Sequence, residues 1–89
     1  MTDTQITQFV TVAKYLNFSR TAEVLYVSQP ALSKQIQKLE TELGFPLFVR
    51  STHDVRLTPA GETMFRYFDS VLTSYEQVLK KARAQSAAA

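Results

Sequence analysis

The sequence predicts a mainly α-helical domain with three closely spaced helices, a short two-stranded hairpin and one long C-terminal helix. Three observations lead to this expectation. Apolar residues recur at helical spacing up to residue 43, with few residues left over for loops. Gly44 and Pro46 then interrupt the pattern before two short β-forming segments, and a new helical pattern begins at Pro59. At 89 residues the chain suits one small domain with a thin margin of stability.

The first helix is expected from Thr4 to Leu16, with Asp3 or Thr4 as its cap. Its inward face is defined by apolar residues at helical spacing: Ile6, Phe9, Val10, Ala13 and Leu16. Asn17 tolerates a left-handed backbone and is expected to close this helix. A second, short helix is expected to be capped by Ser19 and to reach about Tyr26, with Ala22 and Leu25 facing inward.

The third helix is expected from Gln29 to Leu43, capped by Ser28 and ended by Gly44. Pro30 falls in its first turn, where no backbone hydrogen bond is lost. A helical wheel separates a buried edge from a polar edge. The buried edge holds Leu32, Ile36, Leu39 and Leu43, whereas the polar edge holds Pro30, Lys34, Gln37 and Thr41, flanked by Ser33 and Gln29.

A hairpin is expected after the third helix, because LFVR (47–50) and VRLT (55–58) are rich in β-formers and STHD (51–54) suits a turn. Thr58 is then placed to cap a helix with Pro59 at its first position. This helix is expected to reach about Ala84, and AQSAAA at the end of the sequence is interpreted as a fraying terminus.

The last helix carries more apolar surface than a small domain can cover. A heptad-like stripe is formed by Met64, Phe68, Val71, Tyr75, Val78 and Ala82, and Phe65, Leu72 and Leu79 recur on an adjacent face. At about 1.5 Å per residue the helix should approach ~40 Å in length. We therefore expect part of this surface to bind a partner; the alternative is that both stripes pack on the chain's own core.

Composition restricts the function classes. The net charge of +2 permits nucleic-acid binding without requiring it. No cysteine is present, and there is one histidine, so neither a thiolate metal site nor a convincing catalytic group is expected. The start lacks the features of a signal peptide and no apolar run is long enough for a membrane span, so a cytoplasmic protein without cofactor or metal is expected.

The polar edge of the third helix is suited to reading DNA. A short helix, a tight turn and a second helix with a polar outer face match the helix-turn-helix, whose second helix enters the major groove. Gln can read adenine, Ser can donate or accept, and Lys can reach guanine or phosphate. The first two turns also hold no carboxylate, which favours phosphate at the positive end of the helix dipole. Tyr26 stands near the turn, where many such units have glycine.

From about Gln5 to Arg83 the chain resembles the N-terminal DNA-binding region of LysR-type transcriptional regulators. The resemblance lies in Phe9 on the first helix, NFSRTAEVL, SQPALSKQIQKLE, LG (43–44), LFVR (47–50) and LTPAG (57–61), in this order. It implies a winged helix-turn-helix over residues 1–58 and a linker helix over 59–89 for dimerisation, with a fraying Ala-rich end. It also implies binding of palindromic operators as a homodimer, or as a tetramer in a full-length protein. Such regulators normally continue into a domain that binds a small-molecule effector, which this sequence lacks.

The resemblance further implies which residues contact each partner. On the recognition helix, 29–43, the expected DNA contacts are Ser28, Gln29, Pro30, Ser33, Lys34 and, with less support, Gln37. The wing, 47–58, is expected at the minor groove, with Arg50 and His53 as candidates. The residues expected at the dimer interface are Met64, Phe68, Val71, Leu72, Tyr75, Val78 and Leu79.

Some interpretations stay open at this stage. His53 stands where family members usually have a basic residue, so it is either a wing contact or a solvated turn residue. Arg50 either contacts a phosphate or braces the fold. The chain as a whole could instead be a winged helix used for protein contact through its long helix, or a winged-helix repressor of another kind that acts without an effector domain. An enzyme is not expected.

Overall fold

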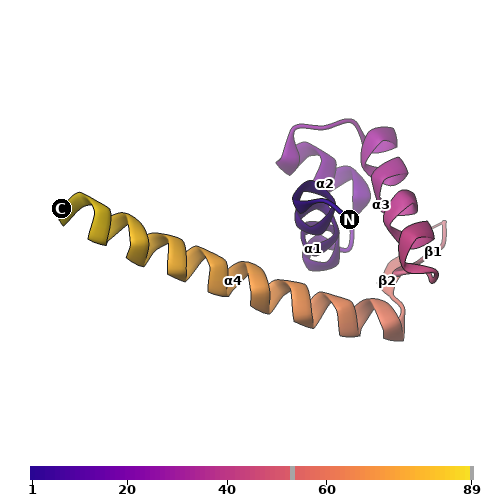
Figure 1. The fold of residues 1–89 in the computed structure, drawn as a ribbon. Coiled ribbons are helices and arrows are strands. Elements are labelled where there is room, and N and C mark those ends of the chain that lie inside the picture. The colour runs from indigo at the N-terminus through magenta and orange to yellow at the C-terminus, as the bar shows by residue number, and fades with distance from the viewer. Residues whose placement is uncertain (53, 89) are drawn as a thin grey trace.

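The computed structural model describes residues 1–52 and 54–88. Within them the chain forms α1 (Asp3–Tyr15), α2 (Phe18–Leu25), α3 (Gln29–Leu43), β1 (Phe48–Arg50), β2 (Val55–Leu57) and α4 (Pro59–Ala88). The first three helices and the hairpin gather into one body, and α4 extends from it as a long arm (Figure 1). The molecule accordingly measures 54 × 26 × 20 Å along its principal axes. The predicted mainly α-helical architecture is confirmed.

The first helix is capped earlier than expected. Thr2 forms a capping box with Gln5: its hydroxyl oxygen accepts from Gln5 N at 3.1 Å, while Gln5 Oε1 accepts from Thr2 N at 3.0 Å. The expectation of Asp3 or Thr4 as the cap was therefore wrong, because the reciprocal bonds need a Gln or Glu three residues after the cap. This box starts α1 at Asp3.

The turn between α1 and α2 also differs from the expectation. Leu16, rather than Asn17, adopts the left-handed conformation that ends α1, with φ 51°, and its side chain is exposed instead of facing the core. Asn17 instead caps α2, because its Oδ1 accepts from Arg20 N at 2.9 Å. Ser19 is thus not the cap, and α2 ends one residue before Tyr26, which is itself left-handed with φ 57°.

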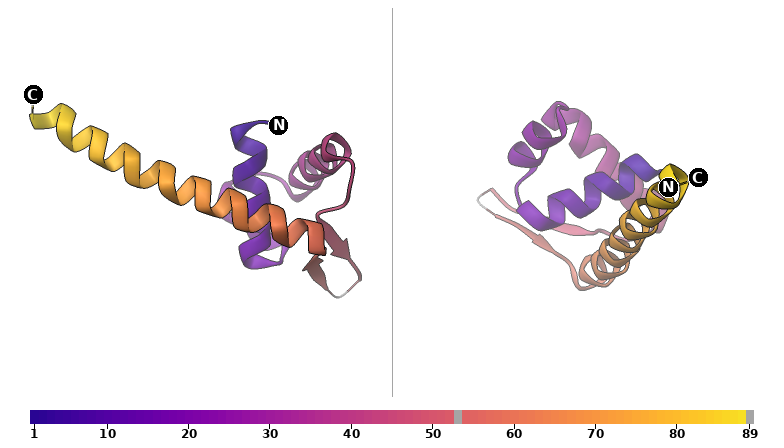
Figure 2. Two further views of the ribbon diagram at one scale, coloured as in Figure 1. Left: turned by 60° about the horizontal axis from the view of Figure 1, so that its bottom comes forward. Right: turned by 90° about the vertical axis from the view of Figure 1, so that its left-hand side faces the viewer.

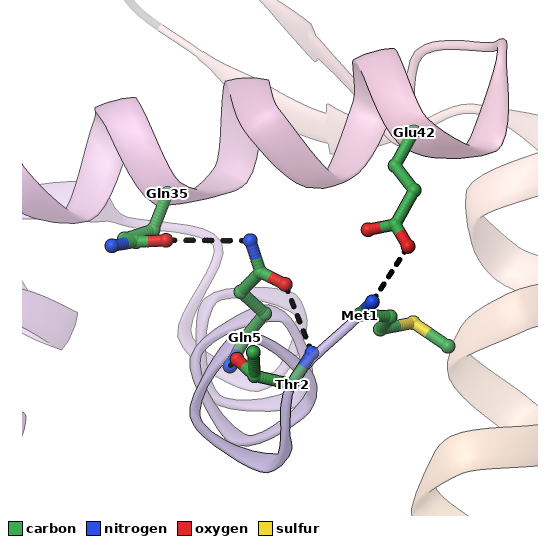
Figure 3. Close-up of polar contacts among 5 residues, drawn as sticks. All are labelled: Met1, Thr2, Gln5, Gln35 and Glu42. Carbon is green, nitrogen blue, oxygen red and sulfur yellow. Dashed lines mark hydrogen bonds and ion pairs between the residues drawn. The ribbon is translucent and has the colours of Figure 1, made fainter.

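The start of α1 is attached to the flank of α3, as Figure 3 shows. Gln5 is almost fully buried, and its Nε2 donates to Gln35 Oε1 at 3.3 Å. The amino group of Met1 forms an ion pair with Glu42 at 2.6 Å. These contacts use a flank of α3 and leave the side chains of its polar edge free of α1.

The core is centred on α1, which contacts α2, α3 and α4. Figure 2 shows α1 lying across the base of α4. The buried edge expected for α3 is confirmed for Leu32, Ile36 and Leu39, which are fully buried, while Leu43 is half-buried. Most of the core is apolar and aromatic: Phe9, Val10, Val12, Ala13, Phe18, Ala22, Leu32, Ile36, Leu39, Leu47, Phe48 and Phe68.

Four phenylalanine rings join the wing to α4 through the core. Phe18 packs edge-on against Phe48 at 5.7 Å between ring centroids, and Phe48 packs against Phe9 at 5.6 Å. Phe9 in turn meets Phe68 of α4 at 6.2 Å. Phe68 is 5% exposed, so this ring is already covered within the chain. Its expected place in a dimer interface stays a prediction, and its burial leaves little of the ring for a partner.

The hairpin is antiparallel, with Phe48 opposite Leu57, Val49 opposite Arg56 and Arg50 opposite Val55. Its attachment to α3 depends on Glu40, whose Oε2 accepts from Leu47 N at 2.7 Å and from Phe48 N at 3.3 Å. A carboxylate on α3 thus satisfies two backbone donors at the start of the hairpin.

The start of α4 is fitted closely to the wing. Thr58 caps it as predicted, because its Oγ1 accepts from Gly61 N at 2.9 Å. Thr58 N also donates to the carbonyl of Leu47 at 2.9 Å. A Cβ on Gly61 would lie 2.1 Å from that carbonyl oxygen, so only glycine fits here without a shift of backbone.

The far end of α4 continues to Ala88, four residues beyond the predicted end at Ala84. The reason is that alanine has the highest helix propensity and nothing in this segment stops a helix. No helix in the described part of the chain is both long enough and apolar enough to cross a membrane.

Candidate nucleic-acid interface

The first turn of α3 is capped, exposed and free of acidic side chains. Ser28 caps it as predicted, with its Oγ accepting from Ala31 N at 3.2 Å. Gln29 and Pro30 follow in the first turn, are exposed, and are accompanied by no acidic residue. The positive end of the helix dipole therefore faces solvent without a neutralising carboxylate.

The polar edge of α3 continues along two further turns. Lys34 and Gln37 are exposed, and Ser33 is half-buried on the flank that faces the wing. A shallow hollow of about 470 Å³ runs beside them and is lined by Lys34, Gln37, Lys38, Thr41 and Glu42. Lys38, which also lines this hollow, was not among the expected site residues. Thr41 is less available, because its hydroxyl donates to the Gln37 carbonyl at 2.9 Å.

Arg50 connects the wing to the starts of α2 and α3. Its guanidinium carbon lies 4.0 Å from the centroid of the Phe18 ring, a close cation–π contact. Its Nη1 lies 3.4 Å from Ser33 Oγ. The two interpretations of Arg50 are therefore compatible: the guanidinium braces two elements, while the residue as a whole stays exposed. Phe18 was not expected at the site, and its role depends on a contact 32 residues away in the sequence.

A second hollow separates the wing from the starts of α2 and α3. Its volume is about 440 Å³, and it is lined by Leu16, Asn17, Phe18, Ser19, Gln29, Arg50, Ser51, Thr52, Asp54 and Val55. On the hairpin, Asp54 forms an ion pair with Arg56 at 3.0 Å. His53, the predicted wing contact, lies outside the described residues.

Exposed apolar side chains on α4 overlap with its contacts to the core, from Tyr67 onward, and continue beyond them. Val71, Tyr75 and Val78 are 43%, 61% and 65% exposed, whereas Leu72 and Leu79 are half-buried. Met64 packs against the core together with Phe68. Beside the exposed stripe, a hollow of about 360 Å³ opens between α1 and α4 and is lined by Asp3, Ile6, Thr7, Val71, Leu72 and Tyr75.

The combination of α2, a tight turn and α3 with an antiparallel hairpin directly behind it defines a winged helix-turn-helix DNA-binding domain. The sequence model described as "Bacterial regulatory helix-turn-helix protein, lysR family" matches residues 4–62. The chain belongs to this family, and the predicted resemblance is confirmed.

Known relatives and structures support the assignment. The chain is 47% identical over 75 residues to the HTH-type transcriptional regulator BudR of Klebsiella aerogenes. The matched segment covers 84% of this chain and 52% of BudR. The chain is equally identical over 75 residues to the Hca operon transcriptional activator HcaR of Escherichia coli K12, covering 84% of this chain and 25% of HcaR. The chain thus spans about half the length of one regulator and a quarter of the other. Such relatives are transcriptional regulators and not enzymes.

Solved structures share the fold closely. The DNA-binding domain of BenM in complex with benA site 1 DNA superimposes with a TM-score of 0.91 at 32% identity, over 97% of both chains. Full-length OxyR C199D from Pseudomonas aeruginosa gives a TM-score of 0.84 at 43% identity, over 94% of this chain and 28% of OxyR.

Proposed function

We propose that this domain binds palindromic operators in double-stranded DNA as a homodimer, with α3 in the major groove. The observation that carries the proposal is the exposed, carboxylate-free edge at the start of α3. It presents Gln29, Pro30, Ser33 and Lys34, with Ser28 at the cap and Gln37 deeper along the helix. Amide, hydroxyl and ammonium groups of this kind can read base edges and neutralise phosphates.

The wing is proposed to contact the minor groove beside α3. The brace between Arg50 and Phe18 supports a fixed position of β1 relative to α3, with the guanidinium near a neighbouring phosphate. His53 remains a proposed wing contact from the sequence alone.

The proposed dimer forms through the part of α4 beyond the core. We divide the chain by role into the winged domain, 1–58, and the linker helix, 59–89, although the first turns of α4 pack in the same core as the winged domain. The interface is proposed to use Val71, Leu72, Tyr75, Val78 and Leu79. A longer protein in the cytoplasm, with tetramer formation and an effector-binding domain, would extend this arrangement.

Binding to duplexes at several salt concentrations tests the DNA proposal. Fluorescence anisotropy with a palindrome selected from a random pool should show affinity falling steeply with salt. Gln29→Ala and Ser33→Ala should each cost roughly 1 to 3 kcal/mol on that site and relax base preference. Lys34→Ala, as a phosphate contact, should weaken all duplexes similarly and lower the salt slope by about one. A salt-independent affinity would exclude DNA as the partner and favour a protein-contact module.

Sedimentation of charged variants tests the dimer. Tyr75→Asp and Val78→Asp place a carboxylate in the exposed stripe and should yield monomers with an intact fold. Thr73→Asp is the matched control, because its position lies opposite the stripe on a helical wheel and it should remain dimeric. Dimers that persist in both stripe variants would place the interface elsewhere. Phe68→Asp is unsuitable here, since it would put a charge into the core.

A further inference from the structure

Ser33 lies at the centre of a small polar network on the DNA-facing surface. Gln29 Nε2 donates to Ser33 Oγ at 3.4 Å, and Arg50 Nη1 donates to the same oxygen at 3.4 Å. Both distances exceed the usual range of about 2.7 to 3.2 Å for N–H···O hydrogen bonds, so each contact alone is weak. The guanidinium is held from below by the Phe18 ring, 4.0 Å away, and that ring is itself buried against Phe48.

The two contacts determine what the hydroxyl of Ser33 can still do. A serine hydroxyl has one hydrogen to donate and two lone pairs to accept with. Two donors point at its oxygen, and a guanidinium can only donate, so the direction of the Arg50 contact is fixed. Among the described residues no protein acceptor receives a hydrogen bond from Ser33 Oγ, so its hydrogen stays available for a ligand.

We propose that Arg50, held against Phe18, is a positioning residue that makes Ser33 a hydrogen-bond donor toward DNA and so sets base preference at the pair Ser33 reads. The inference rests on the proposed function and adds a specificity role for Arg50 that a phosphate contact alone would not have. A hydroxyl that donates can pair in the major groove with an acceptor: guanine O6 or N7, adenine N7 or thymine O4. Cytosine offers only its N4 amino donor there and is disfavoured.

The same network leaves Gln29 with a defined pair of groups. One hydrogen of its amide is directed to Ser33, which leaves Oε1 as an acceptor and the other N–H as a donor. This is the complement of adenine N6 and N7. The start of α3 therefore presents one donating hydroxyl and one bidentate amide, in fixed relation to each other.

The experiment compares Arg50→Lys with wild type, because lysine keeps the positive charge but loses the planar group that stacks on Phe18. Duplexes are selected from a random pool for wild type, Arg50→Lys, Ser33→Ala and the double variant, and the affinities of single-pair changes are measured at two salt concentrations. The pair read by Ser33 is the one at which Ser33→Ala relaxes the selection. Lys34→Ala serves as the control for a phosphate contact.

In wild type we expect a bias against cytosine of roughly tenfold at the contacted position. Arg50→Lys should lose this bias at the same pair while the salt slope is unchanged, and the double variant should show no further loss there. An unchanged bias in Arg50→Lys, or equal weakening on all duplexes, would overturn the inference. So would a Ser33→Ala variant that relaxes no pair, provided wild type still selects a sequence. If wild type selects none, the proposed function itself fails.

Discussion

Gly61→Ala should destabilise the domain, although the same change in an ordinary helix is stabilising. Alanine is favoured over glycine in helix interiors by about 1 kcal/mol. Here the new Cβ would lie 2.1 Å from the Leu47 carbonyl oxygen, 2.9 Å from its carbon and 3.1 Å from Thr58 Oγ1. Two of these atoms are backbone, and the oxygen also accepts from Thr58 N, so it cannot move away without loss of that bond.

Overpacking of this kind typically costs about 1 to 3 kcal/mol. Because the clash is with a hydrogen-bonded backbone carbonyl, we take the upper part of this range, about 2 to 3 kcal/mol. With the propensity gain of about 1 kcal/mol subtracted, we expect the free energy of unfolding to fall by about 1 to 2 kcal/mol. Urea unfolding followed by circular dichroism measures this value, at one fixed protein concentration because a dimer couples stability to concentration. Ala60→Gly is the matched control: it makes the reverse change at the exposed neighbouring position and should cost at most about 1 kcal/mol. A Gly61→Ala variant as stable as wild type would refute the close approach of α4 to the wing.

Three further predictions concern single side chains. Glu40→Ala removes the acceptor for the N–H groups of Leu47 and Phe48, so the free energy of unfolding in urea should fall by about 2 kcal/mol. Glu40→Gln keeps one acceptor and should lose less. Equal stability of Glu40→Ala and wild type would contradict the contact between Glu40 and the hairpin backbone. Tyr26→Gly should raise the free energy of unfolding by about 0.5 to 1 kcal/mol, because glycine adopts the left-handed conformation of Tyr26 without strain and the lost side chain is 95% exposed. A drop in stability would mean that the contacts of the Tyr26 ring outweigh the strain of its left-handed backbone. DNA affinity should rise as the pH falls from about 7.5 to 6, because an unperturbed histidine gains positive charge in this range. His53→Ala should abolish this rise. The same pH dependence of affinity in wild type and His53→Ala would count against a contact between His53 and DNA.

Strong local signals made α3 predictable from the sequence. Ser28 as cap and Gly44 as stop fix the bounds of the helix, and both predicted ends agree with the structure. The wing was predicted for a similar reason, because Pro46 and Pro59 delimit a short segment rich in β-formers.

The first two helices show where local reasoning falls short. Leucine is rarely left-handed, so nothing in the composition of Leu16 marks it as the end of α1. The displacement of the turn by one residue then made Asn17 a cap instead of a stop. Both residues are exposed and their hydrogen bonds are local, to Val12 and Arg20, so two adjacent positions for the end of the helix remained compatible with the sequence pattern.

The residues of the candidate site were likewise predictable only where a local pattern determines their position. The outward residues of α3 follow from helical periodicity, which is a local property. The contacts of Arg50 with Phe18 and Ser33, and of Glu40 with the wing backbone, join residues that are distant in sequence. Such pairs depend on how elements meet in three dimensions, so sequence reasoning could offer only alternatives for Arg50 and missed Phe18 and Glu40 altogether.

The packing of Phe68 on Phe9 also has a mechanical consequence. This contact seats the base of a rigid arm, and about 30 Å of helix extends from Phe68 to Ala88. A tilt of roughly 10° at the seat would displace the tip by about 5 Å, which is a sizeable part of the ~34 Å that separates successive half-sites on one face of DNA. In the proposed dimer, the angle set by the packing of these two phenylalanine rings would therefore determine the spacing between the paired domains.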